Sequence, residues 1–230
     1  MKKSIVFLLL ALITFNLSAQ TGKWIKLTDG KTFNNWHIYN HPGEAINGKW
    51  KIEKKAFVFD PKGESEWKVN DLVSDVNYED FELTLEWKIE KGGNSGIFYG
   101  IKEDANLEKP YMSGPEIQVL DDENHPDAKQ GKNGNRKAGS LYDMIPSASK
   151  AKAFDNWNKV NIKKKDNVVT ITQNGQVAVT YATVGKEWDA MVNDSKFKGW
   201  EDFGKYASGK IGLQDHGNVV AFRKIKIRAL

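Results

Sequence analysis

The sequence predicts an all-β fold, a sandwich or jelly roll of two antiparallel sheets, and three observations support this. Short segments rich in β-branched and aromatic residues recur along the chain, separated by clusters of glycine, asparagine and proline. Residues 81–90 alternate apolar and polar side chains, which is typical of a strand with one buried face. Residues 167–181 contain two β-branched runs around Asn174-Gly175, a pair that favours a type I′ hairpin.

The other elements are short and carry no helical period between them, so a parallel α/β fold is disfavoured. Residues 186–203 are the best candidate for a helix, which we interpret as a short insertion in a late loop. No repeat or linker divides the chain, so we expect residues 21–230 to form a single domain. The remaining strand candidates are residues 24–27, 36–39, 50–53, 56–59, 95–101, 116–120, 157–163 and 210–228.

Composition and charge narrow the classes of function. The chain has 230 residues, of which 40% are hydrophobic, and this is enough to fill a core. Without Lys2 and Lys3, the 34 basic residues fall to 32 against 30 acidic ones, a net charge of +2. So small a surplus argues against a nucleic-acid partner. Cysteine is absent, which excludes disulfides, thiolate metal sites and a cysteine nucleophile.

The first twenty residues are typical of a secretory signal peptide. Lys2 and Lys3 precede an apolar run over residues 5–15 and a small, polar stretch that ends at Ala19-Gln20. The run is about half of the roughly 20 residues that a membrane-spanning helix needs. We therefore expect cleavage after Ala19 or Gln20, export to the periplasm or the exterior, and no membrane association of the mature protein. A permanent membrane anchor is the alternative.

Residues 92–99 are the first of three segments that could carry chemistry. Gly92-Gly93 allow a sharp start to a strand that presents Asn94 and Tyr99. A phosphate-binding loop would need a helix after the glycines, whereas strand-forming residues follow here. We expect Asn94 and Tyr99 to bind substrate, and a plain β-turn is the alternative.

The second segment, residues 114–127, begins with a strand that has one polar face. Ile117 and Val119 share one face of this strand, and Glu116 and Gln118 share the other. If the apolar pair faces the core, the polar pair points outward, where it is suited to bind sugar hydroxyls.

The loop after this strand places carboxylates next to a histidine. A loop rich in carboxylate oxygens can bind Ca²⁺. A histidine next to carboxylates can bind a transition metal or transfer a proton, and in this loop the residues of that kind are His125 and Asp127. Asp121 and Asp122 could bind a divalent metal, although the spacing of the acidic residues does not require one. The sequence indicates no other cofactor. A solvated acidic loop is the alternative.

The third segment, residues 209–217, repeats the same division of faces. Ile211 and Leu213 share one face of the strand, while Gln214 and His216 share the other. Two strands with matching apolar and polar faces are expected to line one cleft.

Three candidates lie outside these segments. Trp36 is expected to stack on a sugar, because an apolar ring face matches the C–H face of a sugar. Arg223 shares its strand phase with two isoleucines and is expected to point inward, either in a structural ion pair or toward substrate. His37 and His41 either form a wall of the cleft or lie at the surface.

The established catalytic motifs are missing. The chain has no arrangement typical of a Ser/His/Asp triad, a Walker loop, a zinc-binding HExxH helix or a Rossmann glycine motif. The nearest pair of acids, Glu116 with Asp121 or Asp122, does not lie on one alternating strand. Glycoside hydrolysis by paired carboxylates is therefore not supported.

Six motifs follow one another along the chain: NSGIFY (94–99), GPEIQVLDD (114–122), HPD (125–127), GSLYD (139–143), IGLQDHG (211–217) and FRKIKIR (222–228). Taken in this order, they resemble the motifs of the 3-keto-disaccharide hydrolase domain family. The resemblance spans residues 24–230 and implies a concanavalin A-like jelly roll that cleaves glycosides carrying a ketone at C3. Two positions depart from the family pattern: Gly100 stands where a larger residue is common, and Lys224 stands where asparagine is usual.

The chemistry of such a substrate needs only one base. A ketone at C3 acidifies the proton at C2; its removal gives an enolate, the glycosidic oxygen leaves C1, and water adds back. The enzyme must supply a base with a pKa near the working pH, a donor or cation for the enolate oxygen, and a proton for the leaving group. We expect His125 to be the base, with Asp127 orienting it, although His125 and His216 could exchange roles.

The other polar residues are assigned to the substrate. Glu116 and Gln118 are expected to bind hydroxyls or a metal, while Gln214, His216 and Tyr142 complete the donor set. The expected partner is a small-molecule carbohydrate, whose sugar and linkage are not determined, and neither is the oligomeric state. A non-catalytic carbohydrate-binding module is the alternative, since binding needs no titrating base.

Overall fold

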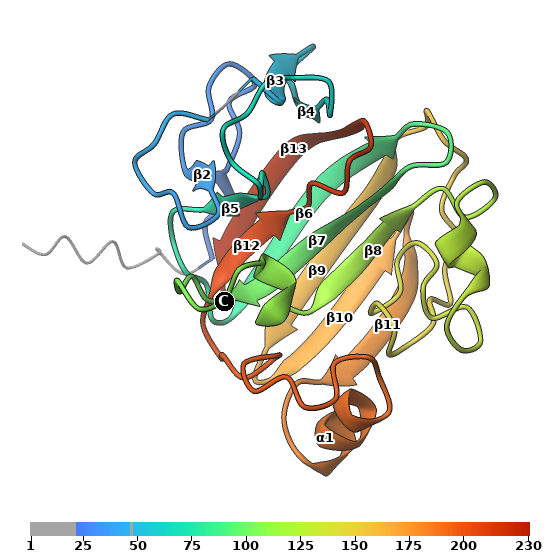
Figure 1. Cartoon of the computed structure of the whole chain (residues 1–230). Coiled ribbons are helices and arrows are strands. Elements are labelled where there is room, and N and C mark those ends of the chain that lie inside the picture. The colour runs from blue at the N-terminus through green and yellow to red at the C-terminus, as the bar shows by residue number, and fades with distance from the viewer. Residues whose placement is uncertain (1–21, 47) are drawn as a thin grey trace, which may run out of the picture.

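Two antiparallel β-sheets packed face to face form the part of the chain that the computed structural model describes, residues 22–46 and 48–230 (Figure 1). The predicted all-β sandwich is confirmed. The larger sheet contains β1 (Ile25–Lys26), β3 (Trp50–Glu53), β4 (Ala56–Phe59), β6 (Phe81–Ile89), β9 (Asn158–Lys165), β10 (Val168–Gln173), β11 (Gln176–Ala182) and β13 (Val220–Ala229). The smaller sheet contains β2 (Trp36–Ile38), β5 (Leu72–Ser74), β7 (Asn94–Ile101), β8 (Glu116–Leu120) and β12 (Lys210–Leu213).

Strands that are far apart in the sequence lie side by side in both sheets. The larger sheet has the order β11-β10-β9-β6-β13-β4-β3, with β1 paired to β13. The smaller sheet has the order β2-β5-β12-β7-β8. The chain therefore crosses repeatedly between the sheets, as a jelly roll requires, and brings the second and third sequence segments onto one sheet.

The core lies between the sheets, where alternate residues of the strands meet. In β6, every second residue from Phe81 to Ile89 is buried and the residues between them are half-exposed, as the alternation predicts. Full burial of a large apolar side chain stabilises a fold by about 1.5–3 kcal/mol. A core of this kind holds the two sheets together without disulfides.

The predicted hairpin at Asn174-Gly175 is confirmed. Strands β10 and β11 pair on either side of the turn. The φ angles of Asn174 and Gly175 are 51° and 86°, the left-handed values that a type I′ turn requires.

Three local predictions were wrong. Strand β5 was missed because its three residues are too short to show alternation. Residues 210–228 form two strands in different sheets, since the chain turns at Gly217, whose φ is 78°. Helix α1 (Lys186–Asn193) ends earlier than residue 203, because Asp194-Ser195 and Gly199 are poor helix formers.

The outer face of the smaller sheet is apolar at one end and polar at the other. At the apolar end, Val73 of β5 and Phe98 of β7 are covered by Tyr111. Tyr111 belongs to the 3₁₀ turn η1 (Pro110–Met112), which follows β7. The polar end of this face is where a binding site can form.

The predicted signal peptide, residues 1–20, lies outside the described residues. Within residues 22–46 and 48–230, the structure contains no helix that is long and apolar enough to span a membrane.

Candidate active site

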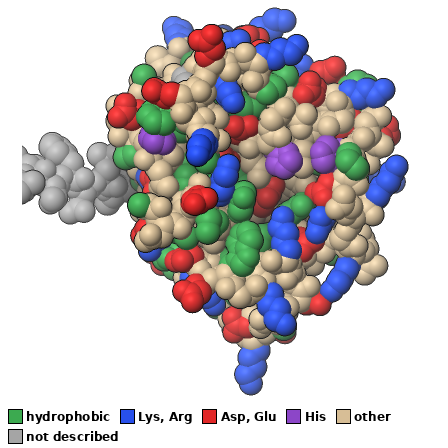
Figure 2. Space-filling model, in the orientation of Figure 1, with side chains coloured by type: hydrophobic (Ala, Val, Ile, Leu, Met, Phe, Trp, Pro, Cys, Tyr) green, Lys and Arg blue, Asp and Glu red, His purple; other side chains and the backbone are tan. Residues whose placement is uncertain are grey.

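A pocket of about 200 Å³ opens at the polar end of the smaller sheet. Figure 2 shows two histidine side chains close together on this face of the molecule, with acidic and basic side chains nearby. The pocket brings together side chains from β7, β8 and the end of β12, as the strand phases predict. Its lining residues are Asn94, Tyr111, Glu116, Gln118, Tyr142, Lys196, Phe197, Gln214 and His216.

Strand register places the polar side chains in one hollow. Gly96 of β7 pairs with Gln118 of β8, and the backbone N–H of Gln214 donates to the carbonyl of Gly96 at 2.9 Å. Asn94 lies two residues before Gly96 on the same face of β7, and Glu116 lies two residues before Gln118 on β8. Adjacent strands thus carry amide and carboxyl groups to a shared surface.

Three amide side chains in this pocket each keep one buried atom without a hydrogen-bond partner in the described chain. These atoms are Asn94 Oδ1, Gln118 Nε2 and Gln214 Oε1, and none of the three side chains is more than 5% exposed. The Oε1 of Gln118 accepts from the backbone N–H of Val119 at 3.2 Å, which leaves Nε2 as the free donor. An unsatisfied buried polar group costs about 1–3 kcal/mol, so these three atoms are suited to bind the polar groups of a ligand.

Glu116 is the buried acid of the pocket. Burial raises its pKa to about 8; the charge of Lys196 opposes this shift, and Asp71 and Asp127 add to it. At neutral pH, Glu116 therefore carries a proton that it can donate.

Lys196 faces Glu116 from the loop that follows α1. Its Nζ lies 4.1 Å from the centre of the Tyr142 ring, a cation–π contact. Desolvation lowers the pKa of Lys196, and the charge of Glu116 opposes this shift. Lys196 was not among the predicted site residues, because it lies within the range predicted as a helix, where nothing in the sequence distinguishes it from Lys198.

His216 and His125 lie near each other at the mouth of the pocket, with ring centres 6.5 Å apart. Desolvation is the largest cause that lowers the pKa of His216, and the charge of His125 acts in the same direction. His216 is therefore a neutral imidazole at pH 7. His125 lies beside the pocket rather than in its lining.

The backbone of Asp127, not its carboxylate, holds the ring of His125. The backbone N–H of Asp127 donates to His125 Nδ1 at 3.1 Å, so Nε2 holds the proton of the neutral ring. The Asp127 carboxylate instead accepts from Arg136 Nη1 at 3.0 Å and from the hydroxyl of Tyr142 at 2.9 Å.

Tyr99 and Trp36 are not in the pocket, so their assignment to the substrate was wrong. Tyr99 is 3% exposed and faces the core, where its hydroxyl lies 2.7 Å from that of Tyr181. The reason is strand phase: Tyr99 has the opposite parity to Asn94. Trp36 is also buried, and its Nε1 donates to the carbonyl of Leu27 at 2.6 Å.

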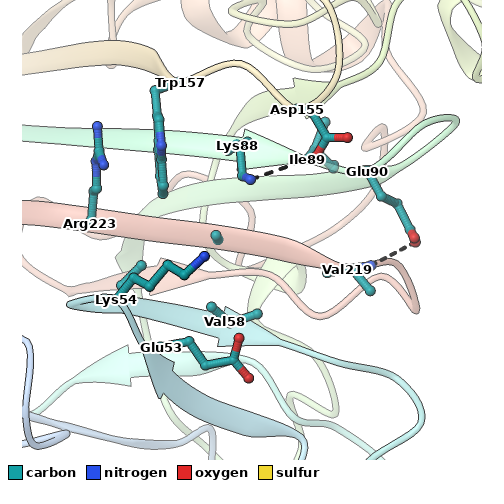
Figure 3. A pocket seen from close by; sticks show the side chains of 12 residues that line it. Glu53, Lys54, Val58, Lys88, Ile89, Glu90, Asp155, Trp157, Val219 and Arg223 are labelled. Carbon is teal, nitrogen blue, oxygen red and sulfur yellow. Dashed lines mark hydrogen bonds and ion pairs between the residues drawn. The ribbon is translucent and has the colours of Figure 1, made fainter.

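Arg223 lies on the outer face of the larger sheet, so its assignment to the substrate pocket was also wrong. Its Nε donates to Glu86 at 2.7 Å, and its guanidinium lies 3.8 Å from the Trp157 ring (Figure 3). An irregularity between Arg223 and Lys226, with φ of 54° at Lys224, shifts the phase and turns Arg223 outward. Of the two alternatives, the structural ion pair, here with Glu86, is the one that the structure shows.

The early histidines have structural partners. His37 is buried, with Nδ1 at 2.6 Å from Asp75 and Nε2 at 3.0 Å from Glu103. His41 stacks on Trp67 with ring centres 3.7 Å apart. Neither residue lines the pocket.

The acidic loop is used by the chain itself. Asp121 accepts from the backbone N–H of Gly92 and from the side chain of Asn124, both at 2.7 Å, and Asp122 accepts from the backbone N–H of Ala138 at 2.8 Å. No group of three or more His, Asp and Glu side chains is arranged to hold a metal ion in residues 22–46 and 48–230. The geometry therefore does not support Asp121 and Asp122 as metal ligands.

Residues 23–228 match the model of the 3-keto-alpha-glucoside-1,2-lyase-like domain. The chain belongs to this family. A relative from Bacteroides thetaiotaomicron, a 3-keto-disaccharide hydrolase, is 39% identical over 239 aligned positions that cover 94% of this chain and 82% of that protein. The resemblance inferred from the motifs is confirmed, and the lyase-like domain is that of a glycoside-acting enzyme.

Solved structures share the architecture of this lyase-like domain. A candidate glycosyl hydrolase from Parabacteroides distasonis aligns with a TM-score of 0.81 and 29% identity, covering 90% of this chain and 94% of that chain. A Bacillus subtilis protein with a galectin-like fold aligns with a TM-score of 0.55 and 12% identity, covering 91% and 97% of the two chains, and is similar in fold alone.

Proposed function

We propose that this enzyme cleaves glycosides that carry a ketone at C3, by elimination across C1 and C2 followed by hydration. The observation that carries the proposal is the meeting of three unpartnered amide atoms with Glu116, Lys196 and His216 in one pocket. The name of the 39% identical relative, 3-keto-disaccharide hydrolase, supports the same substrate class. The sugar, the linkage and the anomer are left open.

His216 is the base of the proposed mechanism. It lines the pocket, and its lowered pKa keeps it unprotonated at pH 7. His125 is the weaker candidate, because the bond to its Nδ1 leaves Nε2 protonated and therefore a donor. The C2–H bond breaks as its proton moves to His216, and the electron pair moves toward the C3 oxygen.

Lys196 and Gln118 stabilise the enolate oxygen that forms at C3. The ammonium group of Lys196 supplies a positive charge, and the free Nε2 of Gln118 supplies a donor. Donors that are already in place where charge develops contribute strongly to catalysis, because they need little reorganisation.

Glu116 serves the leaving group. Its pKa of about 8 keeps it protonated at neutral pH, so it donates a proton to the glycosidic oxygen as the C1–O bond breaks. The resulting carboxylate then accepts a proton from water, whose hydroxide adds to C1. The proton on His216, which is exposed at the mouth of the pocket, exchanges with solvent before His216 returns a proton to C2, so both groups recover their starting states.

Asn94 and Gln214 hold the sugar in place. Their free carbonyl oxygens, Asn94 Oδ1 and Gln214 Oε1, are acceptors for two sugar hydroxyls. This pairing satisfies buried groups that are unsatisfied in the empty pocket, so binding selects a hydroxylated ligand.

Turnover of matched disaccharides tests the proposal. We expect the enzyme to cleave a 3-keto-disaccharide and to leave the unoxidised parent disaccharide intact, because only the ketone acidifies C2. K196M should lower kcat about 10²- to 10³-fold, by analogy with removal of an oxyanion donor. The matched control K198M, in the same loop, should keep wild-type turnover. Binding of both disaccharides without turnover of either would favour the carbohydrate-binding module.

We also propose that the enzyme acts after export. The support is the pattern of residues 1–20, with lysines, an apolar run and a small, polar end. Fractionation of cells that make the full chain should place a shortened protein outside the cytoplasm. Retention of the intact N-terminus in the cytoplasmic fraction would contradict this.

A further inference from the structure

Arg136 joins two acidic side chains beside the pocket. Its Nη1 donates to Asp127 at 3.0 Å, and its Nε donates to Asp143 at 2.7 Å. The side chain of Arg136 is 19% exposed, and those of Asp127 and Asp143 are 12% and 10% exposed. None of these three side chains lines the pocket.

Each of the two carboxylates is connected to Lys196 through a different set of contacts. Asp143 Oδ2 accepts from the backbone N–H of Lys196 at 2.8 Å, which fixes the main chain of the loop. Asp127 Oδ2 accepts from the Tyr142 hydroxyl at 2.9 Å, and the Tyr142 ring lies 4.1 Å from Lys196 Nζ. One guanidinium therefore connects to both the backbone and the ammonium group of Lys196.

We propose that Arg136 is a positioning residue that holds Lys196 in the pocket that it shares with Glu116, through Asp143 and Tyr142. The inference rests on the proposed function for its catalytic consequence, whereas the placement of Lys196 can be measured without a substrate. The planar fork of arginine suits this task, since it binds two carboxylates in fixed directions, which a lysine ammonium does not do.

The charges around Lys196 predict the effect of removing Arg136. Besides Arg136, the charged groups that act on Lys196 are Glu116, Asp143 and Asp127. Without the guanidinium, two largely buried carboxylates lose their cation and attract the Lys196 ammonium away from Glu116. The lysine then becomes harder to deprotonate and less well placed for the enolate.

Three variants test this inference. R136M removes the guanidinium, and R136K keeps the positive charge but loses the fork. Because R136M leaves two carboxylates unpaired and risks unfolding, D143N weakens the same link more gently. Asp143 has a φ of 59°, a conformation that asparagine also tolerates. The matched control is K132M, since Lys132 anchors the same loop through an exposed ion pair with Asp194 at 2.7 Å.

Two readouts separate positioning from general support of the fold. The first is the rate at which acetic anhydride labels Lys196 as a function of pH, followed by peptide mass spectrometry in the absence of substrate. The second is kcat and KM for a 3-keto-disaccharide. A merely structural role would lower the melting temperature without moving the midpoint of the labelling curve.

We expect R136M, which removes a nearby cation, to move the labelling midpoint of Lys196 to higher pH, and D143N, which removes a nearby anion, to move it to lower pH. Both variants should lower kcat on the order of 10- to 100-fold, with a smaller change in KM. R136K should recover part of kcat, and K132M should match the wild type. An unchanged labelling midpoint in folded R136M and D143N would overturn the inference. If the wild type cleaves no 3-keto-disaccharide, the proposed function fails, and the labelling result still decides whether Arg136 positions Lys196.

Discussion

The carboxyl group of Glu116 on β8 lies against the backbone of Gly96 on β7, in the space that a Cβ at Gly96 would occupy. Glycine at this position is therefore what lets the acid fold back across the neighbouring strand into the pocket. Gly96 belongs to the motif NSGIFY, and Glu116 belongs to GPEIQVLDD. The two motifs are therefore in direct contact in the folded chain.

Substitution of Gly96 by alanine should displace Glu116. We expect G96A to keep the fold, with overpacking costing about 1–3 kcal/mol of stability, and to lower kcat/KM on the order of 10²-fold because the acid is misplaced. Steady-state kinetics and thermal unfolding measure the two effects. G48A is the control, since its added methyl group meets its nearest neighbour at 3.4 Å, an ordinary contact. Wild-type kinetics for G96A would show that Glu116 does not need this space.

Glu116 should make the protein less stable as the pH rises. Its pKa is raised from 4.5 to about 8 by burial, so its contribution to folding stability is complete below pH 4.5 and is lost as the pH rises through about 8. Glutamine cannot ionise, and E116Q should therefore gain stability relative to the wild type between pH 5 and pH 9 while losing activity. Melting temperatures across this range measure the difference. The exposed control E123Q should follow the wild type, and a difference for E116Q that does not grow with pH would contradict a buried acid at position 116.

The pH dependence of kcat/KM should be bell-shaped. Activity should fall on the acid side below pH 6.5, where His216 gains a proton, and on the alkaline side above about pH 8, where Glu116 loses one. H216A should abolish most turnover, whereas H125A should retain a measurable part of it. If H125A is inactive and H216A retains turnover, the base has been assigned to the wrong histidine.

His37 should stabilise the fold most at low pH. Burial lowers the pKa of His37, but its hydrogen bonds to Glu103 and Asp75 outweigh this effect and raise the pKa above 6.5. A raised pKa means that the stabilisation is complete below pH 6.5 and is lost as the pH rises through the value in the folded protein. H37Q should cost on the order of 1–3 kcal/mol at pH 5.5 and less at pH 9, as measured by urea unfolding. A cost that is equal at both pH values would show that the imidazole is not charged. H41Q serves as the control.

Strand alternation predicted the all-β fold, and it predicted which strand side chains share the pocket. Glu116 and Gln118, and likewise Gln214 and His216, were placed on the pocket side from parity alone, because a strand has only two faces. The same rule shows the error at Tyr99, which has the opposite parity to Asn94 and therefore enters the core. Arg223 could not be placed in this way, since the irregularity after it changes the phase and leaves no clear mark in the sequence.

Strand alternation could not predict the positions of residues in loops. Lys196 reaches the pocket because Asp143 binds its backbone and the Tyr142 ring receives its ammonium group, contacts that span about fifty positions of sequence. The roles of Asp127 and Arg136 likewise depend on a turn whose geometry no periodicity describes. Tertiary contact alone identifies these residues.

Cleavage of a 3-keto-disaccharide in D₂O, followed by NMR of the released 3-keto sugar at early times, tests the mechanism most directly. Loss of the C2 proton to His216 and its return from solvent predict one deuterium at C2 of the product, beyond the exchange seen when the free 3-keto sugar is incubated without enzyme. Complete turnover with the original hydrogen retained at C2 would mean that the bond is broken by direct hydrolysis, and the proposed pathway would be wrong.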